Sequence, residues 1–200
     1  MANPFPSDSY ERPHWTNALL VAGVDEAGRG ALAGPVVAAA VILDPTSVPS
    51  GLRDSKLLTA AARERLSREI KLHARCWHVC AIGHGRIDDV NILQATFDAM
   101  HGAIDGLSLE PSHLLIDGNR FRPYHIPHTT IISGDSLSVS IAAASILAKV
   151  FRDAFMRDLA LAFPVYGFER HKGYGTVLHR TIIRQHGASD VHRRTFLKNI

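Results

Sequence analysis

Cysteine is scarce in this chain of 200 residues, and long apolar runs are missing altogether. The two cysteines, Cys76 and Cys80, are too few for a disulfide framework. They lie in an apolar run, residues 76–82, where we expect them to be small core residues of a strand. A structural zinc site is the alternative, but it lacks further cysteines to complete it. No stretch approaches the roughly 18 consecutive apolar residues that indicate a membrane-spanning helix.

The amino-terminal residues lack the apolar segment of a secretory signal, so we expect a cytoplasmic protein without a membrane partner. Residues 1–18 are polar and contain several prolines, which predicts a flexible lead-in. Residues 19–200 contain no internal repeat and no long linker. They fit one domain with a core of its own.

Basic residues are concentrated in residues 167–200, which hold seven Lys or Arg and two acids, a net +5. Because the whole chain is +3, residues 1–166 sum to −2. This contrast indicates a polyanionic partner; an ordinary solvated helix is the alternative. We expect Arg193 and Arg194 to contact phosphates unless they pack internally. We expect most histidines of the chain to face solvent or nucleic acid.

Apolar periodicity predicts an α/β domain with a mixed central sheet. Two short runs, residues 19–24 and 35–43, lie close enough in sequence to form a hairpin. The clearest helix spans residues 90–107, where apolar residues recur at steps of three and four. Further strands are expected at residues 76–82, 114–116 and 129–132, and further helices at 59–73, 138–162 and 176–185.

Four acidic residues follow predicted strands. Asp25 and Glu26 close the first strand, Asp117 closes the fourth, and Asp135 lies between the fifth strand and the long helix. The carboxyl ends of strands in α/β domains form one ligand-binding edge, so these acids are expected to be neighbours. Two divalent cations about 4 Å apart can clamp the attacking and leaving oxygens of a phosphodiester. Grouped carboxylates repel one another unless cations neutralise them, so the pattern indicates a metal site.

Each of these acids also has a purely structural interpretation. Asp117 precedes a glycine and could belong to a turn. Asp135 could cap the helix that follows it. Asp25 and Glu26 could form a solvated strand end. The metal-site interpretation therefore depends on the combination, since all four acids terminate apolar strands.

The motifs around these acids resemble the type 2 ribonuclease H family, ribonuclease HII. They occur in the family's order and span about residues 22–197. The matching segments are VDEAGRG (24–30), AGPVV (33–37), DSK (54–56), LIDGN (115–119), GD (134–135), IAAASILAKV (141–150), RD (152–153), HKGYGT (171–176) and HRRTF (192–196).

The resemblance implies a ribonuclease H-like α/β fold, a mixed five-stranded sheet flanked by helices, with additional carboxyl-terminal helices that help hold a duplex. It implies that Asp25, Glu26, Asp117 and Asp135 bind two divalent cations, Mn²⁺ or Mg²⁺. The implied activity is hydrolysis of the RNA strand of RNA–DNA hybrids and cleavage 5′ of ribonucleotides embedded in duplex DNA, as in ribonucleotide excision repair. The products would carry 3′-hydroxyl and 5′-phosphate ends. We expect a monomer whose partner is this nucleic acid.

By the same resemblance, Gly28, Arg29 and Gly30 read the 2′-hydroxyl that distinguishes RNA from DNA. Glycines allow the backbone to approach a ligand closely, although an ordinary tight turn is the alternative. Tyr174 would stack on the sugar after the ribonucleotide and bond its 2′-hydroxyl; a surface aromatic is the alternative. Arg29 and three lysines are candidate phosphate contacts, with solvated side chains as the alternative for the lysines. These lysines are Lys56, Lys149 and Lys172.

One position departs from the family pattern. Ser133 precedes the Gly-Asp pair, where members of the family usually carry Lys. The resemblance therefore predicts that a positive charge near the substrate phosphate is missing, while the metal ligands are retained.

Two other classes of function compete with this interpretation. A nucleic-acid-binding module without activity would gain nothing from acids that face phosphates. A different metal-dependent phosphoryl-transfer enzyme on the same fold would share the acids but would not need residues 28–30 together with Tyr174.

Overall fold

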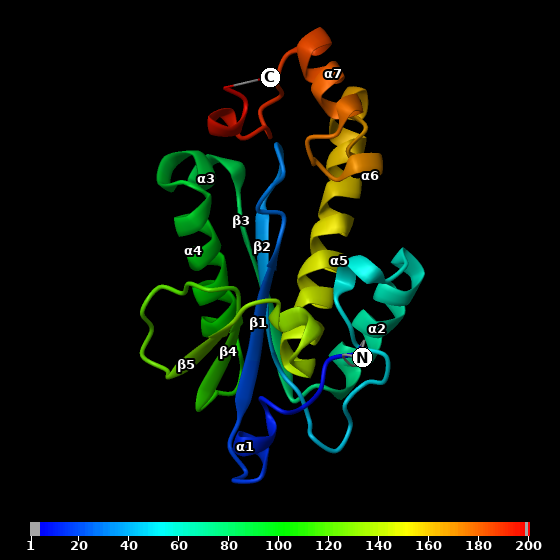
Figure 1. Cartoon of the computed structure of the whole chain (residues 1–200). Helices are drawn as coiled ribbons and strands as arrows, with labels where there is room; N and C mark the ends of the chain where they lie inside the picture. Colours follow the sequence, from blue (N-terminus) through cyan, green and yellow to red (C-terminus); the bar gives the residue numbers. More distant parts are fainter. Residues whose placement is uncertain (1–4, 199) are drawn as a thin grey trace.

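The computed structural model describes residues 5–198 and 200, which build one mixed five-stranded sheet (Figure 1). The strand order is β3-β2-β1-β4-β5. β2 pairs antiparallel with β1 and β3, whereas β4 pairs parallel with β1 and β5. The predicted hairpin and the predicted mixed sheet are thus confirmed. The strands are β1 (Val21–Ala27), β2 (Val36–Ile42), β3 (Cys76–Ile82), β4 (His113–Asp117) and β5 (His128–Ile131).

Helices cover both faces of the sheet (Figure 1). α3 (His84–Val90) and α4 (Ile92–Asp105) lie on one face, and α2 (Ala60–His73) and α5 (Val139–Ala162) lie on the other. Among the described residues, no helix is both long and apolar enough to cross a membrane. The shorter helices are α1 (Arg12–Trp15), η1 (Ser55–Leu57), η2 (Gly134–Ser136), η3 (Pro164–Tyr166), α6 (Phe168–His171), α7 (Val177–His186) and η4 (Arg194–Phe196).

β2 is buried on both faces because it runs through the middle of these layers. Its side chains alternate between the core under α4, which includes Ala38, and the core under α5, which includes Ala39. Small side chains let the helices approach the sheet closely. On β1, this close approach is most pronounced at Gly23. A Cβ atom on Gly23 would lie 2.1 Å from the carbonyl carbon of Ser140, so glycine is required there to seat the start of α5. This contact fixes α5 against the strand that carries the first two acids.

The predicted helix at residues 90–107 is present as α4, with one difference at its start. Asn91 has a φ of 72° and ends α3. Its side chain then caps α4 by accepting hydrogen bonds from the backbone N–H groups of Leu93 and Gln94 at 3.0 and 3.2 Å. The preceding helix α3 was not predicted, because residues 84–90 show no clear apolar periodicity.

Residues 5–18 pack against the domain, which corrects the prediction of a flexible lead-in for this part; residues 1–4 lie outside the described residues. Glu11 is fully buried. Its Oε1 accepts hydrogen bonds from the hydroxyl of Ser138 at 2.5 Å and from the N–H of Ser140 at 2.9 Å, both at the start of α5. Ser7 also forms a β-bridge with Ser138. The composition of this segment resembles that of a loose terminus, but the Glu11 carboxylate and the Ser7 bridge attach it to the start of α5.

Three histidines of the carboxyl-terminal segment are buried and are exceptions to the prediction that most histidines face solvent or nucleic acid. His171, His179 and His192 are 8%, 0% and 1% exposed. Nδ1 of His179 donates to the carbonyl oxygen of Tyr174 at 3.0 Å, which leaves its Nε2 to accept from Nε2 of His192 at 3.0 Å. Nδ1 of His192 then accepts from the hydroxyl of Ser189 at 2.8 Å. The chain of bonds is complete only while both rings are neutral.

Burial lowers the pKa of His179 to about 4 and also lowers the pKa of His171 and His192. Histidine in an unfolded chain has a pKa near 6.5. Between about pH 6.5 and pH 4, His179 is therefore protonated in the unfolded chain but neutral in the folded protein. The free energy of unfolding should therefore fall as the pH drops through this window, by up to about 3 kcal/mol from His179.

Chemical denaturation at pH 7 and at pH 5 measures how much the free energy of unfolding differs between the two pH values. This difference should be smaller in His179→Gln than in wild type. It should be unchanged in His186→Gln, since His186 is exposed at the end of α7. An unchanged pH dependence in His179→Gln would show that acid sensitivity arises elsewhere.

Candidate active site

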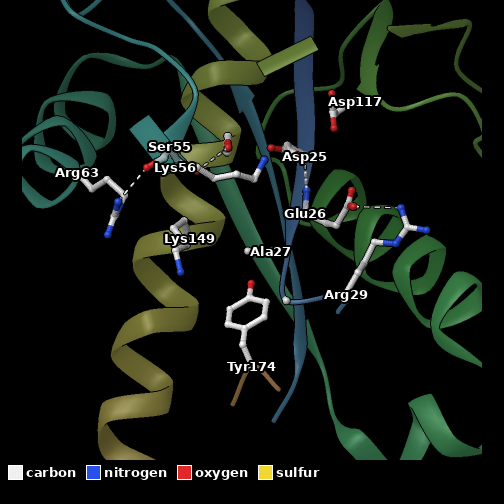
Figure 2. A pocket seen from close by; sticks show the side chains of 12 residues that line it. Asp25, Glu26, Ala27, Arg29, Ser55, Lys56, Arg63, Asp117, Lys149 and Tyr174 are labelled. Atoms are coloured by element: carbon white, nitrogen blue, oxygen red, sulfur yellow. Dashed lines mark hydrogen bonds and ion pairs between the residues drawn. The ribbon is translucent and has the colours of Figure 1, made fainter. Parts of the chain in front are cut away.

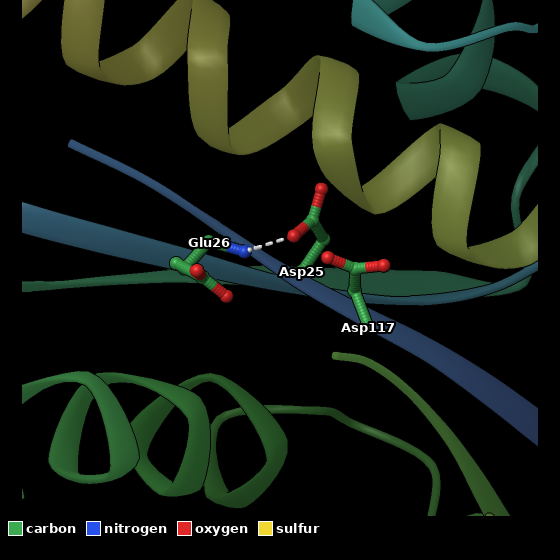
Figure 3. Close-up of side chains that lie close together, drawn as sticks. All are labelled: Asp25, Glu26 and Asp117. Atoms are coloured by element: carbon green, nitrogen blue, oxygen red, sulfur yellow. Dashed lines mark hydrogen bonds between the residues drawn. The ribbon is translucent and has the colours of Figure 1, made fainter. Parts of the chain in front are cut away.

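The parallel pairing of β1 with β4 brings three carboxylates together at one edge of the sheet. Val24 pairs with Ile116, so Asp25 and Asp117 come next on neighbouring strands. One carboxylate oxygen from each of Asp25, Glu26 and Asp117 lies within 4.8 Å of the other two (Figure 3). The structure therefore brings three of the four predicted metal ligands into one cluster.

Asp25 and Glu26 point to opposite faces of β1 because strand side chains alternate. Asp25 is 4% exposed, and the nearby Ser145 hydroxyl of α5 acts to lower its pKa. Oδ1 of Asp25 accepts the N–H of Glu26 at 2.6 Å. Glu26 lies on the α4 side, where its Oε1 is 3.3 Å from Nη1 of Arg29. The cluster thus straddles the end of β1.

Asp135 lies beside the three-carboxylate cluster and is linked to it by its neighbours. It is buried in η2, and the N–H of the preceding Gly134 donates to Oδ1 of Asp117 at 2.7 Å. Oδ2 of Asp135 lies 3.3 Å from Nζ of Lys56. The fourth predicted ligand therefore stands next to the cluster, held by η2 on one side and by a lysine on the other.

Lys56 supplies a positive charge at this point, although Ser133 replaces the family's usual lysine. Ser133 is exposed and adopts a left-handed conformation with φ 56°. Burial opposes the charge of Lys56, but the carboxylates of Asp135, Asp54 and Asp25 raise its pKa above the ordinary value. The ammonium group therefore stays charged beside Asp135.

The carboxylates of the site are electrostatically strained. Burial raises the pKa of Asp25 well above its ordinary value, and the charges of Glu26 and Asp117 raise it further. Burial also raises the pKa of Glu26, although a nearby guanidinium opposes the shift. Burial and a neighbouring carboxylate raise the pKa of Asp135. Within residues 5–198, Asp25 has no ion-pair partner of its own.

The donor set of the cluster fits divalent cations. Its ligand atoms are carboxylate oxygens, which hard cations such as Mg²⁺ and Mn²⁺ prefer. They are close together and largely buried, and the basic side chains nearby pair with Glu26 and Asp135 rather than with Asp25. A divalent cation would supply the counter-charge that Asp25 lacks.

A cavity of about 480 Å³ opens beside the cluster (Figure 2). Two predicted substrate residues, Gly30 and Lys172, do not line it. Nζ of Lys172 instead donates to the carbonyl oxygen of Glu169. Nζ of Lys149 lies 2.7 Å from Oδ1 of Asp153, an ion pair that a phosphate would have to compete with. The predicted substrate residues that do line the cavity are Gly28, Arg29, Lys56, Lys149 and Tyr174.

Three further polar side chains line the cavity and were not predicted. The hydroxyls of Ser55 and Ser145 lie 3.0 Å apart, and the Ser145 hydroxyl acts to lower the pKa of Asp25. Both serines stand inside the motifs quoted above, and a lone hydroxyl in the Ala-rich stretch of α5 was an available signal. Arg63 donates to the carbonyl oxygen of Ser55 at 2.9 Å. Nothing in its local sequence distinguishes Arg63 from the other basic residues of α2.

Arg193, predicted as a phosphate contact, is a buried residue. It is 0% exposed, and its guanidinium donates to the carbonyl oxygens of Gly34 at 3.0 Å and Arg29 at 2.9 Å. Burial, followed by the charge of Arg152, lowers the pKa of Arg193 to about 9. Arg194 is exposed. The two neighbours therefore have different roles, which residue type alone does not indicate.

Substituting each arginine separately should distinguish these roles. Arg194→Ala is expected to lower the slope of log affinity against log salt by about 0.9, the effect of one lost phosphate contact. Arg193→Ala should leave the slope unchanged and lower the free energy of unfolding by about 2–4 kcal/mol, because two buried carbonyls lose their donor. Hybrid binding at several salt concentrations and urea denaturation measure the two effects. A reduced slope in Arg193→Ala at full stability would contradict the assignment.

Comparison with known proteins agrees with the geometry. A model of the family described as Ribonuclease HII matches residues 22–199. Ribonuclease HII of Acidovorax sp. (strain JS42) is 54% identical over 182 residues, which cover 91% of this chain and 87% of that protein.

Solved structures give the same result for the fold. The ribonuclease H2 from Pyrococcus horikoshii OT3 has a TM-score of 0.74 at 26% identity and covers 90% of this chain and 100% of that chain. A chain of the PCNA:RNase HII complex from Archaeoglobus fulgidus has a TM-score of 0.75 at 26% identity, covering 88% and 94%. The present chain therefore belongs to the ribonuclease HII family and is a metal-dependent endoribonuclease of the ribonuclease H type.

Proposed function

We propose that this endoribonuclease cuts immediately 5′ of ribonucleotides embedded in duplex DNA, as well as the RNA strand of RNA–DNA hybrids. The products carry 3′-hydroxyl and 5′-phosphate ends. One observation carries the proposal. The carboxylates of Asp25, Glu26 and Asp117 share a cavity with Gly28 and Tyr174, so a hydrolytic centre adjoins groups that can contact a ribose.

Asp25, Glu26, Asp117 and Asp135 are the residues that would hold two divalent cations, Mn²⁺ or Mg²⁺. When bound, such cations polarise the phosphodiester and lower the pKa of the attacking water. The chain itself contributes fixed carboxylates. Oδ1 of Asp25 is held by the N–H of Glu26 at 2.6 Å, and Oδ1 of Asp117 by the N–H of Gly134 at 2.7 Å. Because these oxygens are already oriented, little reorganisation is needed when charge develops on the phosphate.

The metal ligands do not select the ribonucleotide, because the same phosphate occurs in DNA. Gly28 supports selection through the backbone. Its φ is +95°, and a Cβ atom there would lie 2.0 Å from Nε of Arg152, so only glycine fits and the peptide groups face the cavity without a side chain. Tyr174 supports selection because it lines the same cavity and its hydroxyl points toward Ala27 and the acids (Figure 2). A ribose between them would meet polar groups at its 2′-hydroxyl.

The proposed partner is a nucleic-acid duplex. Cleavage by this enzyme at ribonucleotides misincorporated into DNA would be a step of ribonucleotide excision repair. Every group used in the proposal comes from one chain, which supports a monomer.

Three matched duplexes test the proposed function in the presence of Mn²⁺: all-DNA, DNA with one ribonucleotide, and a continuous RNA–DNA hybrid. We expect cleavage of the second and third and none of the first. A binding module would cut none of them. A metal-dependent nuclease without ribose selection would cut the all-DNA duplex at a comparable rate.

A further inference from the structure

Arg152 of α5 is fully buried, yet no carboxylate lies within ion-pair distance of its guanidinium in the described part of the chain. Its neighbour Asp153 pairs with Lys149 and Arg63 instead. All hydrogen bonds of Arg152 go to backbone carbonyl oxygens. Burying a charge without a counter-charge is costly, so the bonds to these carbonyl oxygens must offset that cost.

The carbonyls that Arg152 binds belong to two loops, which we call the glycine loop (residues 28–35) and the tyrosine loop (residues 172–174). In the glycine loop, Nε donates to Pro35 at 2.9 Å and Nη2 to Ala33 at 3.2 Å. In the tyrosine loop, Nη1 donates to Lys172 at 2.9 Å. One guanidinium therefore ties both loops to α5.

Both recognition residues also pack directly on this guanidinium. Cζ of Arg152 lies 5.2 Å from the ring centroid of Tyr174. Gly28 also approaches so closely that a Cβ atom there would overlap Nε of Arg152. The two loops are joined further by the N–H of Leu32, which donates to the carbonyl oxygen of Gly173 at 2.8 Å. Arg152 and this direct bond together set the separation between Gly28 and Tyr174.

We propose that Arg152 is a positioning residue for ribonucleotide selection, which holds Gly28 and Tyr174 on opposite sides of the ribose. The inference depends on the proposed function, since it assumes that these two residues contact the ribose. The planar fork of arginine suits the task because its donors reach three carbonyls at fixed angles. Lysine would retain the charge and reach fewer of them. Arg152 itself does not line the cavity, so it acts through the two loops.

A double-mutant cycle between Arg152 and Tyr174 tests this role, with kcat/KM for the single-ribonucleotide duplex corrected for the folded fraction. Arg152→Met should lower kcat/KM about tenfold or more with Tyr174 present and less than about threefold in a Tyr174→Ala background, because the residue it positions is then gone. Arg152→Lys should lie between wild type and Arg152→Met, and it carries the test if Arg152→Met does not fold.

Glu11→Gln is the matched control. It alters a buried ionisable residue that bonds the first residues of α5 rather than its middle, so its effect on kcat/KM should be the same factor with and without Tyr174. If Arg152→Met or Arg152→Lys also costs the same factor in both backgrounds, the inference is overturned and Arg152 is merely structural. If Tyr174→Ala alone cuts at the wild-type rate, the recognition model of the proposed function fails instead.

Discussion

Asp25→Asn is expected to lower cleavage by about 10³-fold or more while the protein still folds and binds an RNA–DNA hybrid. Asp25 sits at the centre of the cluster, with Glu26 and Asp117 on either side. Removing one anionic ligand weakens cation binding and disrupts the preorganised field around the phosphate. The measurement is the single-turnover rate on the single-ribonucleotide duplex, together with hybrid binding.

The same substitution should stabilise the protein when divalent cations are absent. Because burial raises the folded-state pKa of Asp25 above its unfolded value, its charged form costs free energy at neutral pH, and a neutral amide removes that cost. We expect a higher melting temperature for Asp25→Asn in EDTA and a smaller gain from Mn²⁺ than in wild type. Asp158→Asn, at an exposed position on α5, is the control and should change neither value. Near wild-type cleavage by folded Asp25→Asn would refute the metal-site assignment.

Tyr174→Ala is expected to cause a severe loss of cleavage and Tyr174→Phe a mild one. Loss of the phenol hydroxyl removes one hydrogen bond to a neutral group, about 0.5–1.5 kcal/mol or roughly tenfold. Loss of the ring removes stacking as well, a further ~1–3 kcal/mol. The ring also covers Arg152 and Lys149, at 5.2 and 5.6 Å from its centroid, so Tyr174→Ala exposes two cations to water.

Both variants are compared by their cleavage rate on the single-ribonucleotide duplex. Tyr10→Ala serves as the control, because Tyr10 is a partly exposed aromatic residue far from Tyr174 in the sequence. Equal rates for Tyr174→Ala and wild type would reduce Tyr174 to a surface aromatic. Equal losses for Tyr174→Phe and Tyr174→Ala would place the whole effect in the hydroxyl and remove stacking from the account.

The clustering of Asp25, Glu26 and Asp117 could be predicted because it follows from strand topology. An acid that ends a buried strand can lie only at the sheet edge, and two parallel neighbours bring such acids together. The position of Asp135 beside the cluster was less determined, since it depends on the turn at η2 and on Lys56 from another loop.

The roles of basic residues and histidines were harder to predict. Arg193 and Arg194 are adjacent and chemically alike, but only the fold decides that one is buried among carbonyls and the other exposed. His179 is an exception to the prediction that most histidines face solvent or nucleic acid, because its two ring nitrogens are satisfied internally. The partners of Arg193 and His179 are set by the folded structure, and local periodicity carries no information about them.

The most direct test of the central claim is to map the product ends of a DNA duplex that contains one ribonucleotide, cut in the presence of Mn²⁺. If the carboxylate site activates water for attack on the phosphate 5′ of the ribonucleotide, two products are expected. One is a DNA fragment that ends in a 3′-hydroxyl, and the other begins with a 5′-phosphate on the ribonucleotide. Cleavage on the 3′ side with a 2′,3′-cyclic phosphate, or cleavage that persists in EDTA, would contradict the account, because the ribose hydroxyl would then be the nucleophile and the carboxylate cluster would not be the catalytic centre.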